Sequence, residues 1–236
     1  RSPPRRSSSP IPRSHQAATP PPADRLRLAL VKRPNGELVL VTGASRSGKT
    51  TWVVHQVRKA PRLLVWDGAG DWQAHGCEPI RTPHELRERV KGARLERLAY
   101  VPPKITPAHF DLFCNIAWVW IRLARGSLVV EELADVTHPG KAPVAWGEIL
   151  RKGLRYGPAI YAITQRPSES DKTAIGNASR VHCHRMQRAA DCAYIAAELR
   201  VPVEEVDRLR PFEWIERDAW GRVTRGVGLR SRAPRA

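Results

Sequence analysis

The sequence predicts an α/β fold in which a mostly parallel sheet carries helices on both faces. Short apolar runs alternate along the chain with helix-like stretches. A phosphate-binding motif stands between the first run and the first helix, and polar side chains follow several later runs. Strands that are apolar throughout belong in a parallel sheet covered on both sides, and such sheets bind ligands at the carboxyl ends of their strands.

The first strand is predicted at Leu38–Val41, and a complete G-x-x-x-x-G-K-[ST] motif follows it from Gly43 to Thr50. Its two glycines let successive N–H groups face phosphate oxygens, and the helix that opens at Lys49 presents its positive end to the same anion. We expect Lys49 to meet the β- and γ-phosphates of ATP and the Thr50 hydroxyl to bind Mg²⁺. The expected nucleotide contacts are Gly43, Ala44, Ser45, Arg46, Ser47, Gly48, Lys49, Thr50 and Thr51.

Two more strands and two more helices follow. The strands are predicted at Leu63–Trp66, which ends in Asp67, and at Leu98–Val101. Thr82-Pro83-His84-Glu85 and Thr106-Pro107 are typical helix starts. The second helix carries two apolar stripes, which indicate either deep burial or a contact between subunits. The stripes are Phe110, Phe113, Ala117 and Ile121, and Leu112, Ile116, Trp120 and Leu123.

The fourth predicted strand, Ser127–Val130, ends in two carboxylates. A residue at the strand end can reach Mg²⁺, and the next residue can polarise the water that attacks the γ-phosphate. We therefore interpret Glu131 as the metal-side acid and Glu132 as the catalytic base, with Asp135 as a weaker candidate.

The fifth predicted strand, Ala159–Ile163, leads into Thr164-Gln165-Arg166-Pro167. Gln165 stands where a polar side chain can sense the γ-phosphate or the attacking water, and the Arg166 guanidinium can neutralise negative charge on a phosphate. Alone this strand exit would be unremarkable. After a phosphate-binding loop and a Glu-Glu pair it becomes informative.

Composition and charge suggest how the chain is divided. Its 236 residues carry 40 Lys and Arg against 23 Asp and Glu, a net charge of +17, which favours a polyanionic partner. Residues 1–24 and 221–236 are basic and rich in Pro, Ser or Gly, so we expect a flexible, disordered N-terminal arm and a flexible C-terminal tail. Residues 25–220 are predicted to form one P-loop ATPase domain.

The four cysteines contain no C-x-x-C pair, which fits a reducing compartment. A metal site at His182-Cys183-His184 is disfavoured, because alternation along a strand places Cys183 on the face opposite the two histidines. The most apolar helix-like stretch, residues 110–123, is too short to cross a bilayer, and no signal peptide is visible.

The ordered set GASRSGKT, LLVWD with a nearby DW, LVVEE, GLRYG and ITQRPSES resembles the FtsK/HerA superfamily of DNA-pumping ATPases, with a RecA/ASCE-like P-loop fold. Within it, the chain is most similar to the small genome-packaging ATPases of tailless, membrane-containing icosahedral viruses of the tectivirus type. The resemblance spans residues 38–216. One departure is Glu131-Glu132 where the family usually has Asp-Glu.

This resemblance implies a homo-oligomeric ring, commonly a hexamer, with ATP and Mg²⁺ between subunits and double-stranded DNA in a basic pore. Lys49 and Thr50 match the Walker A residues, Glu131 and Glu132 the Walker B pair, and Gln165 the polar sensor. Arg151 and Arg155 lie where the family supplies an arginine to the neighbouring subunit, and we favour Arg155. Candidate DNA contacts are Arg180, Arg185 and Arg188. The expected location is the packaging vertex of the virion and the host cytoplasm, with capsid or viral membrane proteins as further partners.

Several other function classes share part of this pattern. A filamentous-phage assembly ATPase of the zonula-occludens-toxin type has similar motifs but typically a membrane span, and a cellular HerA-like helicase is usually much longer. A nucleotide-gated DNA-binding or scaffold protein would hydrolyse ATP slowly or not at all. A small-molecule kinase would leave the basic charge unexplained. DNA-stimulated ATP turnover separates a motor from a scaffold.

Overall fold

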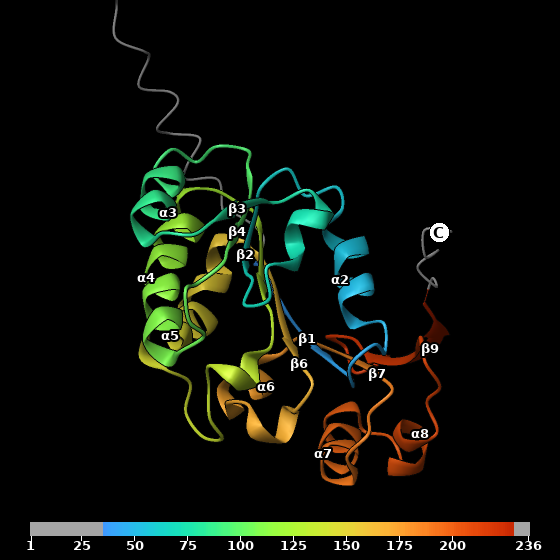
Figure 1. The fold of residues 1–236 in the computed structure, drawn as a ribbon. Coiled ribbons are helices and arrows are strands. Elements are labelled where there is room, and N and C mark those ends of the chain that lie inside the picture. Colours follow the sequence, from blue (N-terminus) through green and yellow to red (C-terminus); the bar gives the residue numbers. More distant parts are fainter. Residues whose placement is uncertain (1–34, 229–236) are drawn as a thin grey trace, which may run out of the picture. The chain divides into compact units, whose positions relative to one another are not determined.

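The computed structural model describes residues 35–228, and Figure 1 shows their fold. The predicted arm at residues 1–24 lies outside the described residues, as do residues 25–34 and 229–236. The expected mostly parallel sheet with helices on both faces is present.

Within residues 35–228, nine strands form one sheet in the order β3-β4-β2-β5-β6-β1-β7-β8-β9. All neighbouring pairs from β3 to β7 are parallel, and β8 and β9 add an antiparallel hairpin at one edge. The strands are β1 (Glu37–Thr42), β2 (Leu63–Trp66), β3 (Glu78–Ile80), β4 (Arg97–Tyr100), β5 (Ser127–Val130), β6 (Ala159–Thr164), β7 (Arg180–His184), β8 (Glu213–Arg217) and β9 (Val223–Val227).

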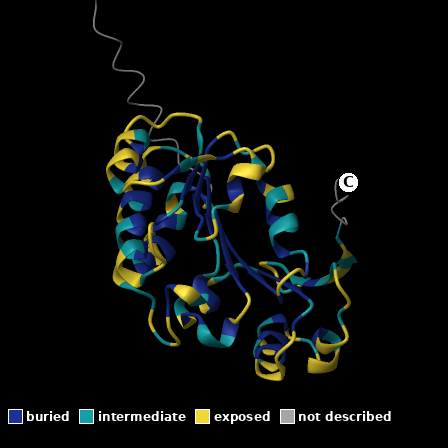
Figure 2. Ribbon diagram, in the orientation of Figure 1, coloured by how far each residue is buried: buried dark blue, intermediate teal, exposed yellow. Residues whose placement is uncertain are grey.

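Helices cover both faces of the sheet, and the central strands are buried along their length (Figure 2). The α-helices are α2 (Lys49–Val57), α3 (Pro83–Val90), α4 (Pro107–Leu123), α5 (Val144–Lys152), α6 (Lys172–Asn177), α7 (Ala189–Leu199) and α8 (Val203–Asp207). Short 3₁₀ helices are η2 (Asp71–His75), η3 (Leu133–Asp135), η4 (Gly153–Tyr156) and η5 (Pro167–Glu169).

Alternation along β1 divides the core. Leu38 packs with α3, α4 and α5, and Leu40 packs with α6, α7 and α8. Val39 and Val41 pack on the opposite side of the sheet with α2 and Trp72 of η2. Period-two alternation in a strand that is apolar throughout produces this division, because successive side chains point to opposite faces.

Both predicted helix starts are confirmed. Thr82 Oγ1 accepts a hydrogen bond from the Glu85 amide at 3.2 Å, and Thr106 Oγ1 accepts one from the His109 amide at 3.3 Å. In α4 the whole first stripe is buried, as are Ile116 and Trp120 of the second, whereas Leu123 is 40% exposed. Deep burial of α4 is therefore the better interpretation. Cys183 packs with Leu40, on the face opposite His182 and Trp52, as alternation predicted.

The prediction of a flexible tail at residues 221–236 is wrong for residues 223–227. Residues 223–227 form β9, which pairs with β8 from Val223 opposite Arg217 to Val227 opposite Glu213. The Arg, Gly and Thr content hid this strand, because an edge strand needs little apolar sequence when backbone pairing with β8 holds it. Strand β3, only three residues long, and strand β8 were not predicted either.

Candidate nucleotide-binding site

The carboxyl ends of β1, β2, β5 and β6 meet around a pocket of about 380 Å³. Strand β6 lies between β1 and β5, so its exit faces both the phosphate-binding loop and the two carboxylates. The pocket is lined by the predicted residues Ser45, Arg46, Lys49, Thr50, Glu131, Glu132, Asp135 and Gln165. The structure therefore brings together groups that are more than a hundred residues apart in the chain.

The loop after β1 needs glycine at two positions. Gly43 has φ 149°, and a Cβ there would lie 2.6 Å from Ser47 Oγ and 2.8 Å from His184 Cβ. Gly48 has φ 110° and caps the amino end of α2, where a Cβ would lie 3.1 Å from the Phe212 ring. Arg46 also has a positive φ, of 57°. These positive φ values let the backbone curl between β1 and α2, as anion-binding loops do.

Lys49 and Glu131 carry opposite charges that burial disfavours. Burial lowers the pKa of Lys49, an effect that the carboxylates of Glu132 and Glu131 partly offset. Burial raises the pKa of Glu131, although the Trp72 hydrogen bond and Lys49 act in the other direction. Each group would regain its charge beside an opposite charge. A phosphate near Lys49 and a divalent cation near Glu131 would provide both.

Glu131 is held by two neighbours. Its Oε1 accepts hydrogen bonds from the Trp72 indole at 3.1 Å and from Thr50 Oγ1 at 3.4 Å. Thr50 and Glu131 thus lie together, as expected of a shared magnesium site. Hydroxyl and carboxylate oxygens are the ligands that Mg²⁺ prefers, so these side chains fit that ion.

Asp67, at the exit of β2, fixes the loop that carries Trp72. Its buried carboxylate accepts hydrogen bonds from the amides of Gly70 at 2.8 Å, Asp71 at 3.1 Å and Trp72 at 2.9 Å. The sequence analysis placed Asp67 at a strand end but gave it no role. An acidic residue followed by two nearby glycines is the local signal that predicts such a side-chain-capped loop.

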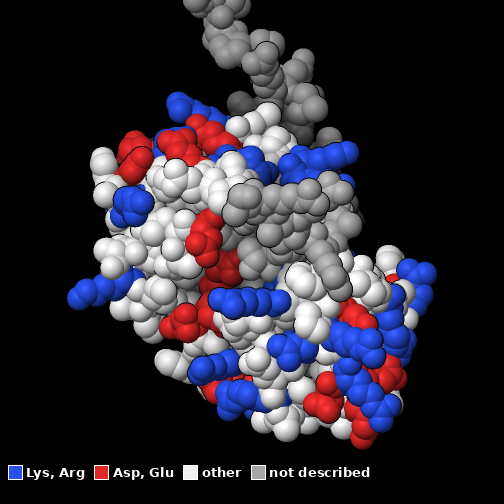
Figure 3. Space-filling model, turned by 45° about the vertical axis from the view of Figure 1, so that its right-hand side comes forward, with Lys and Arg blue, Asp and Glu red and all other residues white. Residues whose placement is uncertain are grey.

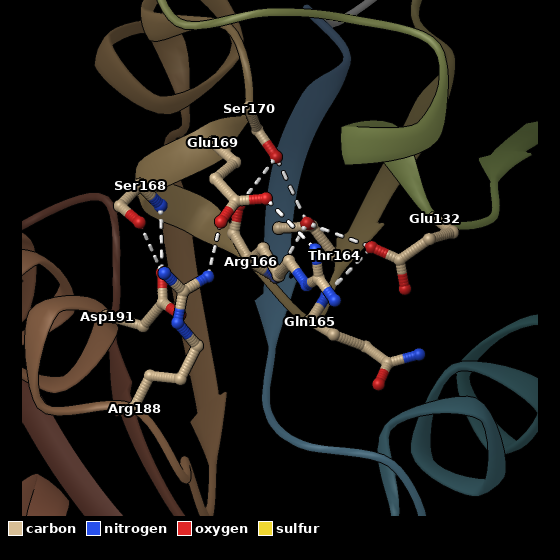
Figure 4. Close-up of polar contacts among 9 residues, drawn as sticks. All are labelled: Glu132, Thr164, Gln165, Arg166, Ser168, Glu169, Ser170, Arg188 and Asp191. Atoms are coloured by element: carbon tan, nitrogen blue, oxygen red, sulfur yellow. Dashed lines mark hydrogen bonds and ion pairs between the residues drawn. The ribbon is translucent and has the colours of Figure 1, made fainter.

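Glu132 begins the turn after β5 with a left-handed backbone, φ 43° and ψ 70°. Its Oε1 accepts hydrogen bonds from Thr164 Oγ1 at 3.2 Å and from the Gln165 amide at 3.0 Å, as Figure 4 shows. Glu132, the predicted base, is thereby tied to the strand exit that carries Gln165, the predicted polar sensor. Asp135, the weaker candidate, is exposed at the rim of the same pocket.

The three candidate arginines are divided between the two ends of the sheet. Arg166 is at the pocket end and forms an ion pair with Glu169 at 3.2 Å. Arg151 and Arg155 are exposed and lie near the opposite end of the sheet. The Leu154 carbonyl, which lies between them in the sequence, accepts a hydrogen bond from the Gly36 amide just before β1 begins, and this contact places the segment at that end. Six residues of β1 at about 3.3 Å each separate that level from the phosphate-binding loop. Neither arginine can reach the pocket of its own subunit.

Aromatic and histidine side chains that the sequence analysis missed lie behind the loop. Phe212, with φ 71°, packs against Gly48, and its amide donates to the Ser47 carbonyl at 3.0 Å. His184 is buried beside the loop, and burial lowers its pKa to about 3. A second cavity of about 250 Å³ opens here between α2 and β8, lined by Thr51, Trp52, Phe212 and Trp214. No sequence motif marks these residues, because β8 is distant from the loop in sequence and comes next to it only when the chain folds.

Two of the expected DNA contacts are engaged within the chain. Arg180 forms ion pairs with Glu37 at 3.2 Å and with Glu216 at 3.1 Å, and Arg188 pairs with Glu169. Arg185 is half-buried. Figure 3 shows basic side chains gathered over the region of α7, α8, β8 and β9, interspersed with acidic ones. Most of the excess positive charge lies in residues 1–34 and 229–236, where Asp24 is the one acidic residue.

Across residues 35–228, no helix combines the length and the apolar character that a membrane span requires.

Comparisons with known proteins agree with this fold. No protein-family profile matches the chain. Protein P9 of Pseudoalteromonas phage PM2 is 32% identical over 172 residues, which cover 72% of this chain and 78% of P9. Among solved structures, the genome-packaging NTPase B204 of Sulfolobus turreted icosahedral virus 2 with AMPPCP has a TM-score of 0.68 at 12% identity, covering 82% of this chain and 98% of B204. The B204 DNA-packaging ATPase of Sulfolobus turreted icosahedral virus has a TM-score of 0.65 at 15% identity, covering 84% of this chain and all of B204.

Proposed function

We propose that this chain, which belongs to the family that contains Protein P9 of phage PM2 and shares the fold of the B204 packaging NTPases, is a DNA-pumping ATPase of the FtsK/HerA superfamily. It hydrolyses Mg·ATP to drive double-stranded DNA into a preformed capsid. One observation carries the proposal. Lys49, Thr50, Glu131, Glu132 and Gln165 line a single pocket at the carboxyl ends of the strands.

Each of these side chains has a distinct task. The amides of the loop and Lys49 bind the phosphates, whose charge favours the ammonium form of the lysine. Thr50 and Glu131 would hold Mg²⁺, which when bound neutralises charge on the β- and γ-phosphate oxygens. Glu132 takes a proton from the attacking water, and the Gln165 side chain, exposed at the pocket, orients that water.

The cavity beside the loop suits the base of the nucleotide. It adjoins Gly48 and Thr51, next to the phosphate-binding amides, and Trp52, Phe212 and Trp214 give it an apolar lining. Aromatic faces stack well on a purine ring. Structures of B204 contain AMPPCP, ATP-γS or AMP, which supports an adenine nucleotide as the occupant.

A ring of identical subunits completes the site. Arg151 and Arg155 are too far from their own pocket, so either can act only on the nucleotide of a neighbouring subunit, where a guanidinium would stabilise charge on the transferring phosphoryl group. We favour Arg155, whose exposed side chain lies over the Tyr156 ring with 5.1 Å between the guanidinium carbon and the ring centroid. Arg166 is the remaining candidate for this arginine. The expected assembly is a hexamer.

DNA would be held through its phosphates, without regard to sequence. Since Arg180 and Arg188 are paired within the subunit, we assign much of this attraction to the basic segments at residues 1–34 and 229–236. The packaging vertex of the virion, reached from the host cytoplasm, is the corresponding location, with capsid or viral membrane proteins as docking partners. The phage-assembly ATPase and the DNA-binding scaffold remain the alternatives.

The test measures ATP turnover by the assembled protein with and without double-stranded DNA. DNA should stimulate hydrolysis, and Glu132→Gln should retain ATP binding yet hydrolyse at least about a hundredfold more slowly, because a positioned base is lost while the phosphate cradle remains. Asp135→Asn is the matched control and should keep most activity. Loss of activity in the control alone would make Asp135 the base. A rate of ATP hydrolysis that does not change when DNA is added would favour the DNA-binding scaffold.

A further inference from the structure

The carboxylate of Glu132 is anchored through one oxygen only. Oε1 accepts from both Thr164 Oγ1 and the Gln165 amide, whereas Oε2 points away from the β6 exit (Figure 4). In residues 35–228, no hydrogen bond to Oε2 from a protein group is found. One oxygen thus sets the orientation of the group and leaves the other for water.

The Thr164 hydroxyl has one proton, and its surroundings determine where that proton points. The Arg166 amide donates to Thr164 Oγ1 at 3.1 Å, and Ser170 Oγ lies 3.0 Å away. Ser170 can itself donate to the Arg166 carbonyl at 3.1 Å. An ionised carboxylate only accepts hydrogen bonds, so the Thr164 proton points toward Glu132 whenever that residue is charged. Thr164 itself is fully buried.

The exit loop that carries these donors is fastened to α7. Asp191, buried at the start of α7, accepts hydrogen bonds from the Ser168 amide at 3.1 Å and from Ser168 Oγ at 2.7 Å. Glu169 forms ion pairs with Arg166 and Arg188. The donors to Glu132 therefore belong to a loop whose position is fixed by hydrogen bonds and an ion pair to α7 and to Arg188, the residue before it.

Glu132 itself has a strained backbone. A left-handed conformation at a non-glycine residue is unfavourable, and such strain persists only where neighbouring contacts hold it. The two hydrogen bonds to Oε1 are contacts that hold this side chain.

We propose that Thr164 is a positioning residue for the catalytic base: its hydroxyl fixes Oε1 of Glu132 so that Oε2 faces the attacking water. The inference rests on the proposed function. The hydroxyl does not touch the nucleotide, so it acts on the rate of hydrolysis through Glu132 and not on nucleotide affinity.

The test compares Thr164→Val, Thr164→Ser and the wild-type chain in DNA-stimulated ATP hydrolysis, with kcat and KM for ATP measured separately. Valine keeps the shape and removes the hydroxyl, so kcat should fall about tenfold with KM for ATP within about twofold. Serine keeps the hydroxyl and should restore kcat.

Thr137→Val is the matched control, because Thr137 is also buried and donates to the Leu133 carbonyl at 2.9 Å without touching Glu132. It should hydrolyse ATP within about twofold of wild type. If Thr164→Val does not fold, Thr164→Ala, which places no methyl group against the Arg166 amide, must show the same fall in kcat with KM for ATP unchanged.

Two results overturn the inference while leaving the proposed function intact. One is a hydroxyl-free variant with the wild-type kcat. The other is Thr164→Ser as slow as Thr164→Val, which would assign the effect to packing of the methyl group. A wild-type chain that hydrolyses no ATP overturns the proposed function itself, and this inference with it.

Discussion

Replacing Asp67 by asparagine should loosen the loop that supports Glu131. The carboxylate accepts three amide hydrogen bonds, from Gly70 and Asp71 to Oδ1 and from Trp72 to Oδ2. The carboxamide oxygen can keep the first two. The new NH₂ group would instead face the Trp72 amide, and two donors cannot bond to each other.

The size of the effect follows from these contacts. One hydrogen bond to a buried charge is lost and one buried amide is left without an acceptor, which together cost about 2 kcal/mol of unfolding free energy. For a chain of this size that corresponds to a Tm about 6 °C lower. Exchange of the Trp72 amide with solvent should be about thirtyfold faster if the loop opens by itself.

The assay combines thermal unfolding, amide hydrogen exchange and the Mg²⁺ concentration that supports half-maximal ATP hydrolysis. That concentration should rise several-fold, because the Trp72 indole helps to hold Glu131. Asp71→Asn is the matched control, since Asp71 lies in the same loop with an exposed side chain. Its free energy of unfolding should change by no more than about 0.5 kcal/mol, as is typical of surface substitutions.

Two results would refute the reasoning. An unchanged Tm with unchanged exchange at Trp72 would mean that Asp67 does not anchor the loop. A lower Tm with an unaltered Mg²⁺ requirement would mean that Asp67 stabilises the fold but does not position Glu131.

Three further outcomes are expected. Lys49→Ala should fold normally and hydrolyse no ATP in a turnover assay, because the amine donates to the Ala44 carbonyl at 2.9 Å but supports little packing. Glu131→Gln should raise the unfolding free energy of the nucleotide-free protein at pH 7. Burial raises the folded-state pKa of Glu131 above its unfolded value, so wild-type stability falls as pH rises through that window. The gain measured by denaturant unfolding should therefore vanish below about pH 4. Arg155→Ala should bind nucleotide without hydrolysing it, and mixing it with Lys49→Ala should restore some turnover; mixed rings that stay inactive would exclude Arg155.

The sequence was sufficient for β1, β2, β4, β5 and β6, because an apolar run marks each of these strands, whereas the three-residue parallel strand β3 was not predicted. Thr82 and Thr106 cap the helices that they predict. The edge hairpin escaped prediction because Val223–Val227 owes its structure to pairing with β8 and not to its composition.

Prediction of the site shows the same division. Lys49, Thr50, Glu131, Glu132 and Gln165 stand in local motifs, so the sequence could place them together. Their supports could not be predicted in the same way. Trp72 and Thr164 contact Glu131 and Glu132 across 59 and 32 residues of sequence. Such contacts follow from the order of strands in the sheet, which a single sequence does not specify.

The electrostatics of the pocket connect these predictions. Burial disfavours the charge on Lys49 and also on Glu131, so in the absence of nucleotide the site reduces the stability of the fold. The low polarity responsible for that cost also strengthens the attraction of the site for Mg·ATP, which supplies charge opposite to both groups. A substitution that relieves the cost, such as Glu131→Gln, should therefore stabilise the nucleotide-free protein while weakening its response to Mg·ATP. Measured together, the two changes should be opposite in sign, and a variant in which both rise would contradict this account of the site.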